Sequence, residues 1–90
     1  MLAAQLIERG PLRYTPAGVE AMDCRLTQQT VAFEDGQPRR ISLEIRALAI
    51  GAISRPLAAM ALGSEGVFAG FLASARNGRG LLFHITSLTL

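Results

Sequence analysis

Hydrophobic and polar residues alternate with a period of two over much of this 90-residue chain. The alternation is clear over residues 22–27 and clearest over residues 40–46. Because successive side chains of a strand point to opposite faces, each stretch predicts a half-buried strand. Between them the Asp35-Gly36 pair predicts a tight turn, so the two strands should form a hairpin with a polar outer face.

Apolar segments flanked by turn residues predict three more strands, over residues 2–9, 67–73 and 81–90. One short helix is predicted over residues 54–63, with Ser54 as its N-cap and Gly63 as its left-handed end. The element order is therefore three strands, a helix and two strands. It predicts an all-β OB-fold, a five-stranded Greek-key barrel with one short helix between strands three and four. An SH3-like or other small barrel competes on periodicity alone.

The length and composition favour one folded unit. Ninety residues, half of them hydrophobic, support a single core, and we assign residues 1–90 to one OB-fold domain. Arg, Glu or Gly interrupts every apolar stretch well before the length of a membrane span, and the N-terminus lacks the pattern of a signal peptide. The single Cys24 cannot form an intramolecular disulfide, which agrees with a reducing cytoplasm.

The kind of charge is more informative than its sum. The formal net charge is only +2, which argues against a strongly basic nucleic-acid-binding protein. All nine cationic residues, however, are Arg, and Arg binds phosphate in a bidentate manner and stacks on bases. A high-GC genome that encodes Arg in place of Lys explains the same bias.

No constellation of catalytic or metal-binding residues is present. His84 stands alone, and a metal site needs three or four ligands at suitable spacing. No Ser or Cys has a plausible base and orienting acid, and the Gly-containing segment at residues 77–80 is too short for a phosphate-binding loop. We expect neither catalysis nor a cofactor.

Three segments carry a resemblance to a known family. Residues 12–18 (Leu-Arg-Tyr-Thr-Pro-Ala-Gly), residues 39–45, and Gly63-Ser64 followed by Gly70-Phe71-Leu72 resemble the bacterial single-stranded DNA-binding protein family. The short primosomal branch of that family, which keeps the OB domain and drops the acidic tail, is the most similar. The residues that suggest this branch are Pro11-Leu12-Arg13, Gly70-Phe71, Asn77-Gly78 and His84.

The resemblance implies a homodimer that binds single-stranded DNA in the cytoplasm, associated with the nucleoid. It also implies a bridge between the primosomal helicase and the helicase-loading factor when stalled replication forks restart. Two positions depart from the family: Ser42 stands where Trp is usual and Gln29 where the primosomal branch has Arg. The alternatives are a protein-interaction adaptor with weak affinity for DNA and a general single-stranded DNA-binding domain cut from a longer chain.

Single strands bind OB-folds through a cationic groove with aromatic platforms. The candidate nucleic-acid-binding residues are Arg13, Arg25, Phe33, Arg39, Arg40, Arg46, Arg76 and Arg79. The alternative is a solvated polar face with scattered guanidinium groups. Tyr14 is expected to pack over the end of the barrel, with stacking on a base as the alternative. Phe68, Phe71 and Phe83 are expected in the core or an interface, although Phe71, out of phase with Phe68, could face the groove or a partner.

The first strand is the candidate dimer interface. In the family this strand pairs with its twin across a two-fold axis, which implies that Leu2, Leu6 and Ile7 lie between protomers. Pairing also protects a strand edge that would otherwise be prone to aggregation. Burial of the same residues inside the monomer barrel is the alternative.

Overall fold

Strands dominate the computed structural model, which describes residues 2–75, 78 and 80–90. In chain order the elements are β1 (Leu2–Arg9), β2 (Arg13–Tyr14), β3 (Glu20–Glu34), β4 (Gln37–Ile50), α1 (Ser54–Ala59), β5 (Glu65–Ser74) and β6 (Leu81–Thr89). No helix among the described residues is long and apolar enough to cross a membrane.

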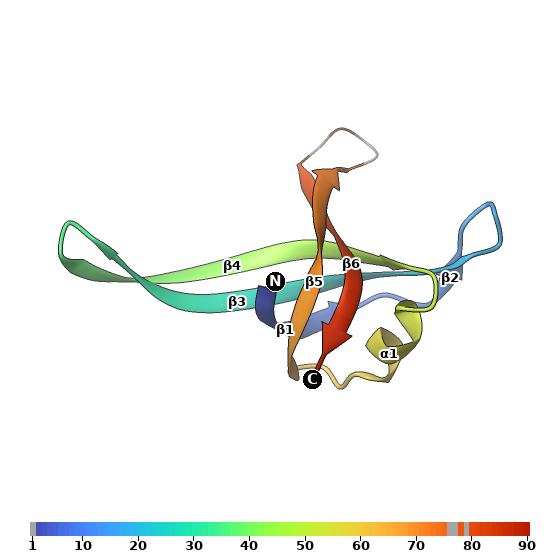
Figure 1. The fold of residues 1–90 in the computed structure, drawn as a ribbon, viewed down its shortest axis with the longest axis horizontal. Helices are drawn as coiled ribbons and strands as arrows, with labels where there is room; N and C mark the ends of the chain where they lie inside the picture. Colours follow the sequence, from blue (N-terminus) through green and yellow to red (C-terminus); the bar gives the residue numbers. More distant parts are fainter. Residues whose placement is uncertain (1, 76–77, 79) are drawn as a thin grey trace.

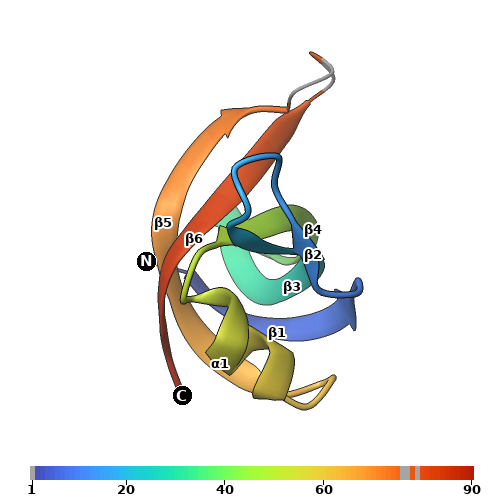
Figure 2. The same cartoon turned by 90° about the vertical axis from the view of Figure 1, so that its right-hand side faces the viewer.

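The sheet closes on itself. Its strands run in the order β1-β5-β6-β4-β3, and β1 pairs with β3 to complete the barrel (Figure 2). The β4–β6 pair is parallel, and the remaining pairs are antiparallel. The predicted OB-fold is confirmed. The short β2, which pairs with β3 through Arg13 and Tyr14, lies in a segment for which the sequence predicted no strand.

Alternation along the strands builds the core. Met22, Cys24 and Leu26 of β3 are buried, as the pattern predicts, while the polar residues between them face outward. Leu57 of α1 and Met60 directly after it are also buried in this core, and Figure 2 shows α1 at one end of the barrel. The helix therefore serves as a plug whose apolar side continues the core.

The helix is shorter than predicted and is held by other residues. It ends at Ala59, and Ser54 is not its N-cap: Ile53 occupies that position without a side-chain hydrogen bond. Ser54 is instead buried, and its hydroxyl donates to the carbonyl oxygen of Gly51. Gly63 does adopt the predicted left-handed conformation, with φ of 89°, but in the loop that follows the helix.

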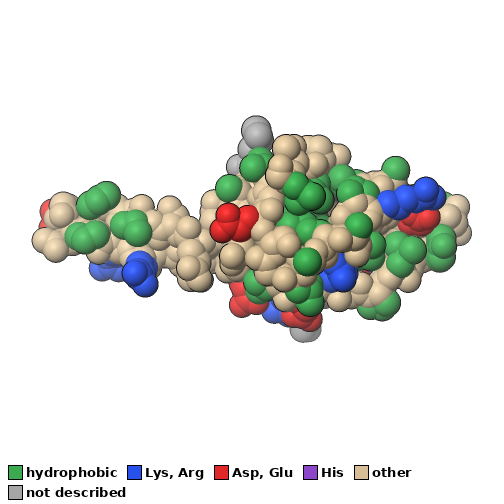
Figure 3. Space-filling model, turned by 90° about the horizontal axis from the view of Figure 1, so that it is seen from below, with side chains coloured by type: hydrophobic (Ala, Val, Ile, Leu, Met, Phe, Trp, Pro, Cys, Tyr) green, Lys and Arg blue, Asp and Glu red, His purple; other side chains and the backbone are tan. Residues whose placement is uncertain are grey.

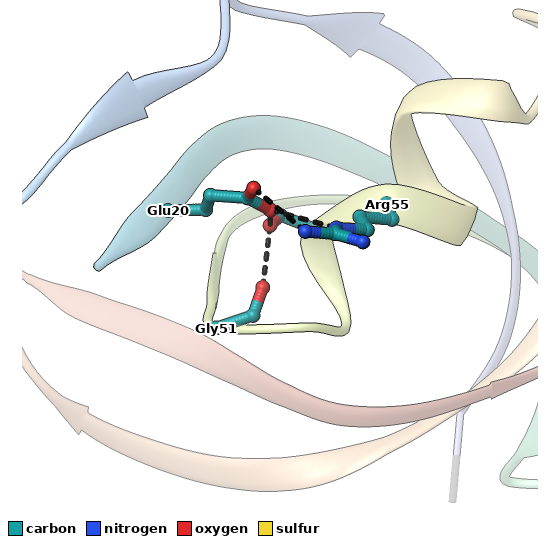
Figure 4. Close-up of polar contacts among 4 residues, drawn as sticks. Glu20, Gly51 and Arg55 are labelled. Atoms are coloured by element: carbon teal, nitrogen blue, oxygen red, sulfur yellow. Dashed lines mark hydrogen bonds and ion pairs between the residues drawn. The ribbon is translucent and has the colours of Figure 1, made fainter. Parts of the chain in front are cut away.

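Two side chains from β1 and β3 secure this end of the barrel. The guanidinium of Arg9 donates to the carbonyl oxygens of Leu57 and Met60, where the helix ends. The carboxylate of Glu20 accepts two hydrogen bonds of 3.3 Å from Arg55 (Figure 4). These bonds tie α1 to β1 and to the start of β3.

A long hairpin projects from the barrel. The β1–β3 pairing ends at Thr27, so the part of β3 beyond Thr27 pairs only with β4 among the described residues. Gln28–Leu43 form an arm that reaches well beyond the barrel (Figure 1), in a molecule measuring 51 × 30 × 18 Å. The predicted turn is confirmed: Asp35 and Gly36 both have positive φ, of 51° and 73°, as a two-residue hairpin turn requires.

The β5–β6 hairpin projects in a different direction (Figure 1) and bends where its register shifts, between Ala69 and Gly70. A Cβ at Gly70 would lie only 1.8 Å from the carbonyl oxygen of His84. Only glycine therefore allows β5 to approach β6 this closely. The loop of this hairpin includes Arg76, Asn77 and Arg79, so the predictions made for them lie outside the described residues.

Candidate nucleic-acid interface

One surface of the β3–β4 hairpin carries several of the predicted binding residues. Cα pairing places Arg25 opposite Arg46, Val31 opposite Arg40 and Phe33 opposite Pro38. Residues paired across two strands share a face. We call this surface the outer face; it comprises Arg25, Thr27, Gln29, Val31, Phe33, Pro38, Arg40, Ser42, Glu44 and Arg46. It runs from the barrel wall to the tip of the arm.

Two arginines of the outer face are available for a ligand. Arg40 and Arg46 are exposed, and neither forms an ion pair with any described residue. Arg25 lies between two carboxylates, with its guanidinium 3.6 Å from Glu8 and 3.5 Å from Glu44. A phosphate approaching Arg25 must compete with those carboxylates, so Arg40 and Arg46 are the stronger candidates.

The other two predicted arginines on described residues are engaged elsewhere. Arg13 donates two hydrogen bonds to Asp23, at 3.0 and 3.3 Å. These bonds and the charge of Asp23 raise the pKa of Arg13 above its ordinary value. Arg39 lies one residue from Arg40 and so on the opposite face, where it pairs with Glu34 at 3.2 Å.

Aromatic side chains reach solvent at the tip and at the base of the hairpin. Phe33 is 75% exposed, as suits a candidate for base stacking. Tyr14, predicted to pack over the barrel end, is instead 65% exposed, because the short β2 holds it outward at the margin of the sheet. In Figure 3 the arm stands clear of the barrel, with hydrophobic and arginine side chains at its surface.

The middle of the arm is polar where the resemblance implies an aromatic residue. Gln29 and Ser42 are Cα partners on the outer face. They border a shallow hollow of about 360 Å³, which is also lined by Thr30, Val31, Arg40 and Ile41. Because neither side chain offers a π-face, stacking on the outer face of the arm depends on Phe33 at its tip.

A second aromatic site was only partly foreseen. Phe68 and Phe83 are buried, as predicted, whereas Phe71 is 55% exposed, so the expectation that it lies in the core is wrong for this residue. Its ring stacks on His84, with 4.8 Å between the centroids and 5° between the planes. Sequence spacing contained one signal: Phe71 is out of phase with the buried Phe68.

The predicted dimer residues divide between core and surface. Leu6 has no exposed area and belongs to the barrel core, so the prediction of an interface is wrong for this side chain. It faces inward because β1 closes the barrel at Leu6, which pairs with Leu26. Leu2 is half-buried against the core, and Ile7, where the register with β3 shifts, is 38% exposed.

In the described part of the chain, no three His, Cys, Asp or Glu residues lie close enough together to share a metal ion.

The closed barrel, the helix at its end and the hairpin, whose Arg40 and Arg46 have no ion pair with a described residue, define the class of protein to which this fold and site belong. They are the features of an OB-fold module built to bind single-stranded nucleic acid.

Comparison with known proteins gives the family. Residues 1–87 match the family described as "another single-strand binding protein family", and the chain belongs to it. Replication restart protein PriB from Bordetella pertussis is 43% identical over 75 residues, which cover 83% of this chain and 70% of that protein. PriB from Bordetella parapertussis matches to the same extent.

Solved structures agree with this result. The structure of PriB from Ralstonia solanacearum has a TM-score of 0.83 and 39% identity, covering 97% of this chain and 90% of that one. The single-stranded DNA-binding domain from a Synechococcus species has a TM-score of 0.74 at 18% identity, covering 99% and 90%, and it shows the shared fold alone. The likeness to the primosomal branch, predicted from short motifs, is therefore confirmed.

Proposed function

We propose that this protein binds single-stranded DNA during replication restart, using the outer face of the β3–β4 hairpin. The observation that carries this proposal is that Arg40 and Phe33, both exposed, lie on one face of a projecting arm, and that Arg40 has no ion pair with a described residue. Phosphates bind the cations and a base stacks on the ring. We further propose that it acts in the cytoplasm, at the nucleoid, where such strands arise.

The affinity should be modest, because three of the five predicted arginines on described residues already pair with carboxylates. Arg13, Arg25 and Arg39 already face carboxylates, and Ser42 offers no stacking surface. Binding should consequently depend on few phosphates and show only a shallow salt dependence, since each phosphate contact on a single strand contributes about 0.7 to the log–log slope.

A titration of a labelled dT oligonucleotide at several salt concentrations tests the proposal. Replacing Arg40 and Arg46 together by Ala should weaken binding and reduce the magnitude of the slope by about 1.4. Arg55→Ala, which removes one positive charge, serves as a control, because Arg55 pairs with Glu20 beside α1 and lies outside the outer face. An unchanged affinity and slope in the double variant would overturn the assignment of this face.

We also propose a homodimer formed through β1. This strand pairs with β5 through Leu2–Gln5 and with β3 through Gln5–Arg9, so each half has one edge without a partner strand among the described residues. A hollow of about 570 Å³ opens where β1 and β3 diverge. A second copy of β1 would pair with the open edge of residues 2–4 on the β3 side. The opposite edge beyond Gln5 is partly occupied, because Leu6 forms backbone hydrogen bonds with Gly63 and Ser64.

Light scattering of the eluting protein tests the dimer. Ile7→Asp should halve the mass without unfolding the barrel, since Ile7 is partly exposed in the monomer. Val19→Asp is a matched control, because Val19 has nearly the same exposure, 39% against 38%, and lies outside β1. A dimer that survives Ile7→Asp would reject this part of β1 as the interface.

A second function, that of an adaptor between replication proteins, is favoured by the three paired arginines and the polar centre of the arm. The resemblance implies the primosomal helicase and the helicase-loading factor as partners. Binding to the helicase that persists at salt concentrations abolishing DNA binding would support this role. An absence of association with either protein would count against it.

A further inference from the structure

The Phe71–His84 pair lies on the same side of the sheet as the outer face. Asp23 of β3 pairs with Leu48 of β4, and Leu48 pairs with His84 of β6, which in turn pairs with Phe71 of β5. Leu48 is two positions beyond Arg46 on the same strand, so both side chains point outward from the barrel. The surface that carries Arg46 therefore continues across β6 to Phe71.

The geometry of the stack leaves one ring face of Phe71 free. The centroid separation of 4.8 Å matches the spacing of about 4.8 Å between neighbouring strands. Stacking therefore runs across the strands, with His84 covering the side of Phe71 that faces β6. The ring is nevertheless 55% exposed, which leaves its opposite side to solvent.

No neighbouring strand covers that opposite side. Pairing between β5 and β1 involves only Glu65–Phe68, so from Ala69 onward the outer edge of β5 has no partner strand among the described residues. Phe71 stands three residues past the end of that pairing. A flat ligand can thus approach the ring from the open edge, in line with the existing stack.

We propose, resting on the function proposed above, that Phe71 and His84 form a base-stacking site that extends the DNA path from the arm across β6 to β5. A nucleobase continues the His84–Phe71 stack on the free face of Phe71, while Arg46 binds phosphate on the intervening surface. Phe71 is the contacting residue and His84 is a positioning residue. This site supplies the aromatic surface that the arm lacks at Ser42.

Stacking and charge can be separated with two oligonucleotides of about 16 nucleotides, the upper range for one OB-fold. One is dT and the other is an abasic strand with the same phosphates and no bases. Phe71→Ala should raise the Kd for dT by about 5- to 20-fold, the loss of one stacked base, and leave the Kd for the abasic strand unchanged. Arg40→Ala should weaken binding of both strands by the same factor.

Two further variants test the kind of contact. Phe71→Leu keeps apolar bulk without a π-face, so it should behave as Phe71→Ala with dT. His84→Ala should weaken dT binding about two- to fourfold, and His84→Phe should restore it, because a second aromatic ring supports Phe71 equally well. Circular dichroism of each variant verifies the fold, which a change at an exposed ring should not disturb.

The chain contains no Trp, so a single introduced Trp reports on one place. The fluorescence of the Phe71→Trp variant should be quenched by dT, whereas that of Leu62→Trp, exposed in the loop beyond α1, should not respond. If Arg40→Ala weakens binding while Phe71→Ala does not and the Phe71→Trp variant shows no quenching, the stacking site is wrong and the proposed function stands. If the unmodified protein binds neither strand, the proposed function fails, and the stacking site fails with it.

Discussion

Strands β3 and β4 run through both the barrel and the arm, and hydrophobic and polar residues alternate along them in both regions. The alternation buries side chains in the barrel but not in the arm. Leu26 and Leu43 both point to the core side of the β3–β4 hairpin, since Leu26 pairs with Ile45 and Gln28 with Leu43. Leu26 is fully buried, whereas Leu43 is 48% exposed. The difference lies in what covers them: α1, β5 and β6 enclose the barrel, and nothing in the described structure covers the arm. Burial of a side chain on this hairpin therefore depends on whether other elements cover it, and not on the hydrophobic-polar alternation alone.

The largest expected effect separates the two leucines. Leu26→Ala should lower the free energy of unfolding by about 2–5 kcal/mol, because it leaves a cavity in a closed core. Leu43→Ala, the matched change on the arm, should cost less than about 1 kcal/mol. Urea unfolding followed by circular dichroism measures both. Equal losses would mean that the arm is packed against something in solution, such as a second copy of the chain.

This pair of leucines also marks how far the sequence could predict the structure. Period-two alternation and the Asp35-Gly36 turn predicted β3, β4 and their hairpin correctly, because strand periodicity and turn chemistry are local. The exposure of Leu43 could not be predicted in this way, and for Phe71 the alternation gave only its phase relative to Phe68. The exposure of both side chains depends on where β1 stops pairing with β3 and β5, which is a property of the closed barrel.

Some residues of the candidate site could be predicted from the sequence and others could not, again because only local features follow from the alternation and the turn. Arg40, Arg46 and Phe33 fall on one face because their spacing and register follow from the hairpin turn. The carboxylates that occupy Arg13 and Arg25 belong to other strands or to distant positions, Asp23, Glu8 and Glu44. Ser54 was misassigned because an N-cap and a buried hydroxyl have the same local sequence.

The next effect concerns Cys24, inside the barrel, and is seen in how the free energy of unfolding depends on pH. Burial, and secondly the charge of Asp23, raises the pKa of this thiol from 9.0 to about 11. The unfolded chain loses the proton first, so the stability from the neutral buried thiol is complete below pH 9 and lost as the pH rises towards 11. The loss amounts to about 2–3 kcal/mol. Cys24→Ala should flatten the dependence of unfolding free energy on pH between 9 and 11.

A thiol reagent can also compare the enclosed barrel with the exposed arm. At about pH 8, Cys24 should react only as fast as the protein unfolds, because the reactive thiolate is scarce and enclosed. A thiol placed on the arm, in Cys24→Ala with Ser42→Cys, should react at once, since Ser42 is exposed. Prompt labelling of Cys24 in the folded protein would mean that the barrel opens locally at β3.

The smallest expected effect compares the two faces of the arm through adjacent arginines. Arg40 lies on the outer face without an ion pair in the described structure, while Arg39 lies on the other face, 3.2 Å from Glu34. Arg40→Ala should weaken dT binding about threefold and reduce the magnitude of the salt slope by about 0.7, the share of one phosphate. Arg39→Ala removes the same charge but should change the Kd less than about twofold. Because net charge falls equally in both variants, a difference between them reports the path of the strand and not the overall potential. Equal losses would show that DNA wraps both faces of the arm, and the outer face would then be only half of the binding surface.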